Sequence, residues 1–91
     1  METDAGGRVF EELALPALND LYRFACRLER DPVRAADLLQ DALIVGLRKF
    51  SQLSQSASFR SWITAIVHRT FLNRQQRSEQ LVALKDGAWA G

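Results

Sequence analysis

The spacing of apolar residues constrains this chain most, because it follows the period of a helix in three separate segments. Residues 8–28 carry apolar side chains every three or four positions, with Leu21 and Ala25 among them. The same spacing recurs in residues 32–50 and 59–80, and no segment shows the strict alternation of a strand. Because such spacing gathers apolar side chains on one face of a helix, the sequence predicts an all-α fold, a compact bundle of three helices.

Both prolines fall where a helix is expected to break or begin. Pro16 interrupts the first segment, because proline lacks an amide hydrogen and clashes with the preceding turn. A complete break there would divide the first helix and give a bundle of four. Asp31 precedes Pro32, which predicts a helix start, since aspartate caps free amides and proline suits the first helical position. Ser58 is expected to cap the third helix in the same way.

The periodicity also predicts which side chains form the core. In the second segment these are Ala35, Ala36, Leu39, Ala42, Leu43, Gly46, Leu47 and Phe50. In the third segment they are Phe59, Trp62, Ile63, Ile66 and Thr70, with Val67 at the edge. Gly46 is expected to let a neighbouring helix approach closely, and Trp62 is interpreted as a core residue rather than a wedge between bases.

Length and composition indicate one globular domain. The chain has 91 residues, of which 47% are hydrophobic and 25% charged. We expect a helical domain over residues 1–80 and a tail or the start of a linker over residues 81–91. The sequence has no apolar run of about 18 residues, and its N-terminal part lacks the apolar segment of a secretory signal. A cytoplasmic protein is therefore expected.

Few residues in this sequence suit catalysis or metal binding. There is one histidine and one cysteine, and neither a glycine-rich phosphate loop nor a metal-ligand spacing occurs. Asp37 and Asp41 lie one helical turn apart, but opposite the predicted core, where water keeps both carboxylates ionised. We therefore expect no enzyme activity, no cofactor and no bound metal.

Charge is unevenly distributed along the chain. Residues 1–47 carry nine acidic and five basic side chains, whereas residues 48–91 carry two acidic and seven basic ones. The basic half is therefore the candidate for contact with a polyanion, although scatter in a small chain would give the same numbers.

The predicted outer face of the second helix combines carboxylates with apolar side chains. Helical spacing places four residues on one strip, namely Asp37, Gln40, Asp41 and Ile44. Leu38 and Val45 are expected beside this strip. An apolar surface edged by carboxylates suits a protein partner that presents basic residues, and the alternative interpretation is an ordinary solvated face.

The predicted outer face of the third helix combines cations with an aromatic ring. It consists of Arg60, Thr64, His68 and Phe71, and Arg74 and Arg77 continue its basic character. Guanidinium groups neutralise phosphates and flat rings stack on exposed bases, which is typical of proteins that bind single-stranded or melted nucleic acid. The alternative is a basic surface helix with one stray aromatic residue.

Two motifs carry a resemblance to a known family. Residues 37–41, Asp-Leu-Leu-Gln-Asp, match an Asp-Leu-x-Gln-Asp/Glu element, and residues 62–66, Trp-Ile-Thr-Ala-Ile, match a Trp-Leu/Ile-x-x-Ile element. Their first residues, Asp37 and Trp62, are 25 positions apart. Over about residues 10–77 the chain resembles region 2 of the extracytoplasmic-function (ECF) group of the sigma-70 family.

The resemblance implies a domain of a bacterial alternative sigma factor, which binds core RNA polymerase and recognises and melts the promoter −10 element. The residues it implies for the polymerase clamp helices are Asp37, Gln40, Asp41 and Ile44. For capture of a flipped base it implies the loop Ser54 to Ser58, with Ser54, Gln55, Ser56 and Ser58 as the polar side chains. For the non-template strand it implies Arg60, Thr64, His68, Arg69, Asn73, Arg74 and Arg77, beside the aromatic ring of Phe71. An anti-sigma factor is a further expected partner, and no membrane contact is expected.

The sequence departs from the family pattern at two positions and in extent. Many members carry Asn at the position of Arg69 and Asp at that of Asn73, so base preference is not carried over. These residues also contain no counterpart of the helix-turn-helix domain that reads the −35 element. One alternative is therefore a sigma-like module that binds an anti-sigma factor without touching DNA. A generic small helical DNA-binding domain is the other, and the lack of a short glycine-containing turn between two helices argues against it.

Overall fold

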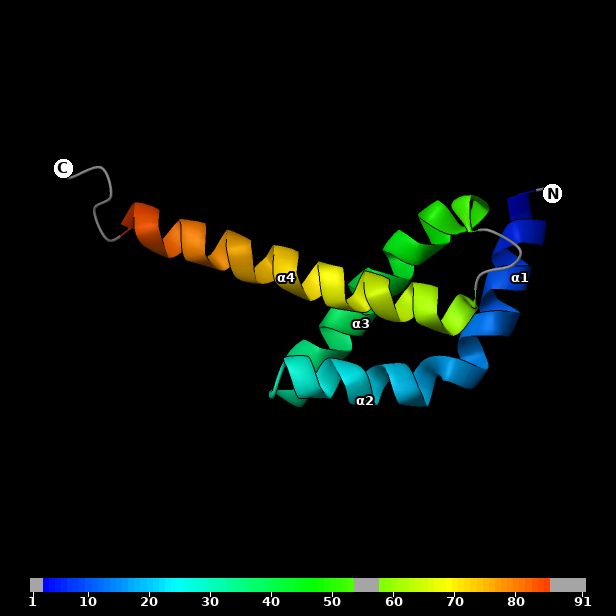
Figure 1. Cartoon of the computed structure of the whole chain (residues 1–91), viewed down its shortest axis with the longest axis horizontal. Helices are drawn as coiled ribbons and strands as arrows, with labels where there is room; N and C mark the ends of the chain where they lie inside the picture. The colour runs from blue at the N-terminus through cyan, green and yellow to red at the C-terminus, as the bar shows by residue number, and fades with distance from the viewer. Residues whose placement is uncertain (1–2, 54–57, 86–91) are drawn as a thin grey trace.

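Pro16 breaks the first helical segment, as the sequence predicts (Figure 1). The computed structural model describes residues 3–53 and 58–85. Helix α1 spans Thr3–Ala14, the 3-10 turn η1 spans Leu15–Ala17, and α2 spans Leu18–Leu28. The chain changes direction at η1, because the proline at its second position cannot continue the α-helical hydrogen bonds.

Asp31 starts the next helix. Helix α3 spans Pro32–Lys49, and the Asp31 side chain accepts a hydrogen bond from the Val33 amide at 3.1 Å. Proline occupies the first helical position, where its missing amide hydrogen costs nothing. The predicted cap is therefore confirmed. A single 3-10 turn, η2 (Phe50–Gln52), extends the end of α3.

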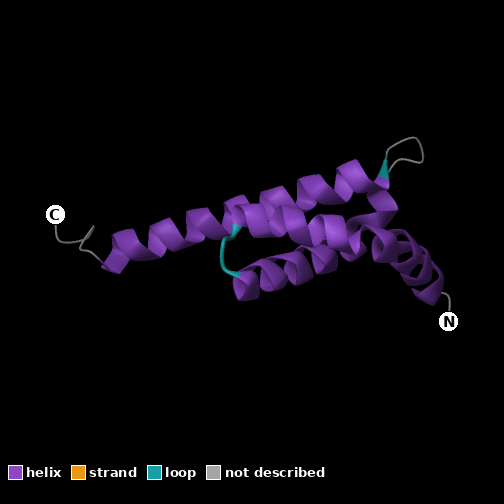
Figure 2. Ribbon diagram, turned by 90° about the horizontal axis from the view of Figure 1, so that it is seen from below, coloured by secondary structure: helices purple, strands orange, loops and turns teal. Residues whose placement is uncertain are grey.

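Helix α4 spans Phe59–Lys85 and so continues beyond Gln80, where the apolar periodicity ends. The Ser61 amide donates to the Ser58 hydroxyl oxygen at 3.5 Å, a long hydrogen bond at the position expected for the cap. Figures 1 and 2 both show α4 crossing α3, with α2 running alongside and the C-terminal half of α4 projecting beyond both helices. The projection accounts for the elongated shape of 53 × 25 × 25 Å.

The core lies where α1, α2, α3 and α4 meet. Its buried side chains are Phe10, Ala14, Ala17, Leu21, Ala25, Ala35, Leu38, Leu39, Ala42, Ile63 and Val67. Every one of them is apolar, and no buried side-chain polar atom lacks a hydrogen-bond partner within the described residues. The described residues contain helices and no strand, so the prediction of an all-α bundle is confirmed.

Gly46 lets α3 and α4 come close together. A Cβ atom at this position would lie 2.5 Å from Cδ1 of Ile63 and 3.3 Å from Cε1 of Phe10. Beside this contact an aromatic cluster joins three elements. The ring centroid of Phe10 in α1 lies 5.5 Å from the ring centroids of Phe50 and Phe59. Trp62 completes the cluster, with its ring 5.9 Å from that of Phe59. The close approach at Gly46 and the packing of these four aromatic rings therefore fix how α3 and α4 cross.

The predicted core face of α3 is displaced around the helix. Leu38 was expected beside the outward strip, but it is 0% exposed and belongs to the centre of the core. Conversely, Ala36 and Leu47 were expected inside and are exposed. The reason is that both α2 and α4 pack against α3. The buried face of α3 is therefore the one that lies toward these two helices, and it differs from the face on which the apolar residues are centred.

Candidate functional site

The acidic strip of α3 consists of Asp37, Gln40, Asp41 and Ile44, and all four side chains are exposed. Ile44 is 45% exposed and lies one turn from Asp41 and two turns from Asp37, so the strip combines an apolar side chain with two carboxylates. The helix presents these side chains away from the core, because the opposite face carries Ala35, Leu38 and Ala42. The exposure that a docking surface requires is therefore present at every residue of the strip.

Arg74 of α4 lies against this acidic strip. Its Nη2 atom donates to Oδ2 of Asp37 at 3.3 Å and forms a second, shorter ion pair with Asp41. Partial burial opposes the charge of Arg74, but hydrogen bonds and attraction from Asp41 and Asp37 outweigh it, and the pKa of Arg74 is raised. The sequence assigned Arg74 to DNA contact, whereas the structure pairs it with the residues expected to bind polymerase.

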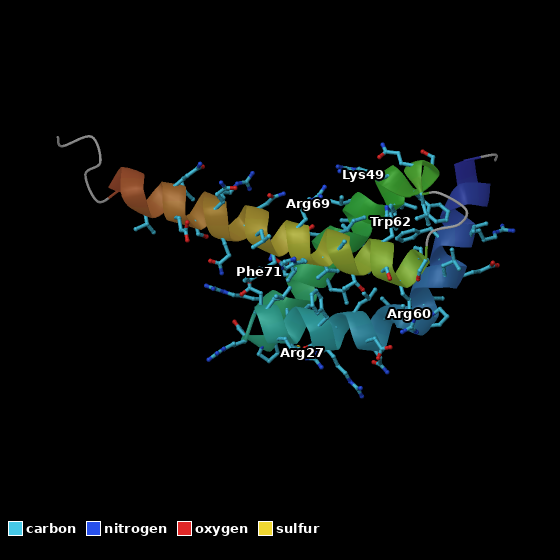
Figure 3. All side chains as sticks on the ribbon, viewed as in Figure 1. Arg27, Lys49, Arg60, Trp62, Arg69 and Phe71 are labelled. Carbon is cyan, nitrogen blue, oxygen red and sulfur yellow. The ribbon has the colours of Figure 1, made fainter. Side chains whose placement is uncertain are left out.

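One side of α4 faces α2, and it is the side that carries Arg60 and Phe71 (Figure 3). Arg60 Nη1 donates to Oδ2 of Asp20 at 2.5 Å, and its Nη2 donates to the Pro16 carbonyl at 3.3 Å. Phe71 is half-buried against the core. The prediction that this side points away from the bundle is therefore wrong for Phe71, whereas Arg60 is exposed as expected but bound to Asp20.

Two further residues of this side remain within reach of solvent. The ring of His68 is exposed and lies 6.3 Å from that of Phe24 in α2, in an edge contact. Thr64 is half-buried and lines a shallow hollow between them. Phe71 and Thr64 are half-buried because α4 packs against both α2 and α3, which cover more than the single apolar stripe that the periodicity shows.

The other side of α4 faces the C-terminal end of α3, and here the two helices form a groove of about 500 Å³. Figure 3 shows Trp62 and Arg69 on the side of α4 that faces Lys49. The lining residues are Val45, Arg48, Lys49, Gln52, Trp62, Ala65, Ile66, Arg69, Thr70 and Asn73. The groove therefore combines three cations with one half-buried tryptophan.

A second hollow of about 320 Å³ adjoins the groove along α4. It shares Val45, Arg48, Thr70 and Asn73 with the groove. It adds Arg74 and Arg77 of α4 together with Asp41 and Ile44 of the acidic strip, so the strip and the groove meet at this hollow. Arg48, Lys49, Arg69 and Arg77 form no ion pair with any residue in the described parts of the chain. We call the two hollows together, with these four cations, the basic groove.

The sequence interpretation missed half of the basic groove. Arg69, Asn73 and Arg77 were named by the family resemblance, and they do share one side of α4. Arg48, Lys49 and Gln52 were not named as site residues. Trp62 packs against the core, as predicted, and it also lines the groove. The adjacent basic residues Arg48 and Lys49 in the last turn of α3 were a visible signal, but only the fold shows that they face Arg69.

The loop expected to capture a base is described only at its two ends. Ser54, Gln55 and Ser56 lie outside the described residues. Before them, Gln52 lines the basic groove, and after them, Ser58 caps α4. The hydroxyl oxygen of Ser58 therefore accepts one hydrogen bond within the fold, and its O–H group is still able to donate.

Features of a metal or membrane site are not found in the described ranges. No group of three or more His, Cys, Asp or Glu side chains could hold a metal ion in residues 3–53 and 58–85. Within the same ranges, every helix is too short or too polar to cross a bilayer.

Comparison with known families identifies the domain. The family model described as sigma-70 region 2 matches residues 14–80, which include α2, α3 and most of α4. No solved structure matched the chain. Sigma-70 region 2 domains bind RNA polymerase and recognise the promoter −10 element, and they are parts of transcription initiation factors rather than enzymes. Because the match covers most of the chain, including the acidic strip and the basic groove, the chain belongs to the sigma-70 region 2 family.

Proposed function

We propose that this chain is the region 2 domain of an ECF-type alternative sigma factor, with the acidic strip as its polymerase-docking surface and the basic groove as its site for the melted −10 strand. One observation carries this proposal. The same two helices, α3 and α4, build two surfaces of opposite charge, which meet at the second hollow, where Asp41 lies among the cations Arg48, Arg74 and Arg77. A domain that binds a protein and a nucleic acid side by side needs this separation of charge.

The chemistry of the acidic strip suits a basic helical partner. Asp37 and Asp41 already bind a guanidinium group, that of Arg74, so their geometry accepts arginine. Ile44 supplies an apolar contact one turn further along α3. The clamp helices of the largest polymerase subunit are the partner that the ECF resemblance implies for this strip.

The chemistry of the basic groove suits a single strand. Arg48 and Lys49 on α3 face Arg69 on α4, so phosphates entering the groove meet cations on both walls. Trp62 lines the same groove and is half-buried, which leaves part of its ring for stacking on an unpaired base. Of the residues expected to contact the strand, we therefore favour Arg69, Asn73 and Arg77 on the α3-facing side of α4 over those on the α2-facing side.

The ECF assignment and base capture rest on the sequence motifs. The two elements at residues 37–41 and 62–66 fall on α3 and α4, in the order and spacing of that group. We propose that Ser54, Gln55 and Ser56 capture a flipped base, and the position of Gln52 at the groove supports a strand path that runs toward this loop.

Docking can be tested by removing the exposed apolar contact. Ile44→Ser should weaken binding of the chain to core RNA polymerase about tenfold, because a buried isoleucine contributes at least about 1.4 kcal/mol at an interface. Binding is measured by fluorescence anisotropy of the labelled chain. Val82→Ser is the matched control, since Val82 is 55% exposed on the projecting part of α4 and should leave affinity unchanged. Equal affinities for the Ile44 variant and the unsubstituted chain would contradict the docking assignment.

The sigma-like module that binds an anti-sigma factor without DNA remains the competing function. It would use the acidic strip but would not need Arg48, Lys49, Arg69 and Arg77. The four cations without ion-pair partners among the described residues favour strand binding, because a protein-only surface would be expected to neutralise such a cluster. If replacing these four cations left the affinity for an oligonucleotide unchanged, the competing function would be favoured.

A further inference from the structure

Arg74 stands between the two proposed surfaces. Its guanidinium binds Asp37 and Asp41 of the acidic strip, and its side chain also lines the basic groove beside Arg48 and Arg77. Among the charged residues lining the groove, Arg74 is the one bound to the strip's carboxylates. It is therefore within reach of two kinds of anion, a carboxylate of α3 and a phosphate in the groove.

The contact with the acidic strip uses a small part of the guanidinium. Nη2 donates both hydrogen bonds, although an arginine side chain has five N–H donors in a planar fork. Asp37 and Asp41 are 66% and 50% exposed, so water competes for them, and ion pairs this exposed are weak. A partner's arginine could therefore replace Arg74 at the carboxylates.

We propose that Arg74 is an internal counter-ion, which neutralises the docking acids in the free domain and turns to a strand phosphate when a basic partner takes its place. The inference rests on the proposed function and adds a coupling between its two surfaces. Because coupling between two binding events is reciprocal, polymerase docking would strengthen strand binding, and a bound strand would strengthen docking. In the free domain the aspartates would hold Arg74, so the domain would bind single strands more weakly than it does once Arg74 is released.

The alternative arrangement is a permanent one. Arg74 would then stay on Asp37 and Asp41 in every complex and orient their remaining oxygens toward the partner. The two arrangements differ in one measurable respect. If Arg74 exchanges, removing its carboxylate partners makes it available to DNA, whereas a permanent Arg74 contributes nothing further to strand binding.

A double-mutant cycle separates the two arrangements without polymerase. Four forms of the chain are compared: unsubstituted, Asp37→Asn with Asp41→Asn, Arg74→Gln, and all three substitutions together. Affinity for a fluorescent single-stranded −10 oligonucleotide is measured by anisotropy at low salt. Loss of two negative charges raises affinity in either background, so the Arg74→Gln background supplies the matched electrostatic control.

The proposal predicts that neutralising the two aspartates raises affinity about threefold more when Arg74 is present than in the Arg74→Gln background. Thermal unfolding of each form verifies that the protein is folded at the temperature of the binding measurement. Increments that are equal, or larger in the Arg74→Gln background, would overturn the exchange of Arg74 and leave the proposed function intact. Absence of binding by all four forms would overturn strand contact by the basic groove, and the exchange with it.

Discussion

The two sides of α4 carry similar residues but differ in what surrounds them. The side facing α2 has Arg60 and Phe71, and the side facing α3 has Arg69 and Trp62. Arg60 is bound by Asp20 and by the Pro16 carbonyl, and Phe71 packs on the core. Arg69 and Trp62 instead line a groove that contains two more cations from α3.

This difference shows that arginines and an aromatic ring on one helix do not by themselves make a nucleic-acid site. What decides is whether a neighbouring element supplies the counter-ion. On the α2 side Asp20 neutralises the arginine, so the pair belongs to the fold. On the α3 side the neighbours Arg48 and Lys49 add charge of the same sign, which costs stability unless an anion binds there.

The largest expected effect is on stability, from the α2 side. Phe71→Ala should lower the free energy of unfolding by about 2 kcal/mol, since it removes a half-buried ring from the core. The oligonucleotide affinity of the folded protein should stay within about twofold. Urea unfolding and anisotropy measure the two quantities. Leu72→Ala is the neighbouring control, because Leu72 is 49% exposed and its loss should cost less than about 0.5 kcal/mol. A stable Phe71 variant that binds DNA poorly would reverse the comparison.

A smaller effect is expected from Arg60→Gln. The variant loses an ion pair between side chains that are 55% and 59% exposed, so stability should fall by about 1 kcal/mol or less. The affinity of this variant for the oligonucleotide should change by less than about twofold. Arg69→Gln should instead weaken binding about fivefold at 0.1 M salt, because it removes one phosphate contact. Similar losses of affinity for the two variants would mean that both sides of α4 meet the strand.

Local signals predicted the elements of this fold well. Pro16, Asp31 and Ser58 act through the backbone of their own helix ends, so their effect can be predicted without knowing the neighbours. The exposure of Asp37, Gln40 and Asp41 also follows from the period of a single helix. Gly46 was predicted to allow a close approach, although the sequence does not name its partner, Ile63.

What could not be predicted depends on contacts between helices. Leu38 is buried because α2 and α4 both cover α3, and an apolar stripe on one helix does not reveal two neighbours. The contact of Arg74 with Asp41 joins residues on different helices, and so does the basic groove. The charges were visible in the sequence, but which of them neutralise one another was set by the crossing of α3 and α4.

The salt dependence of strand binding tests the central claim, that the α3-facing side of α4 holds the strand. If Arg48, Lys49, Arg69 and Arg77 each neutralise one phosphate, the slope of log K against log salt concentration should be about −3 for the unsubstituted chain. Replacing Arg69 and Arg77 by glutamine should reduce it to about −1.5, because two phosphate contacts are lost. An unchanged slope in this double variant would contradict the claim.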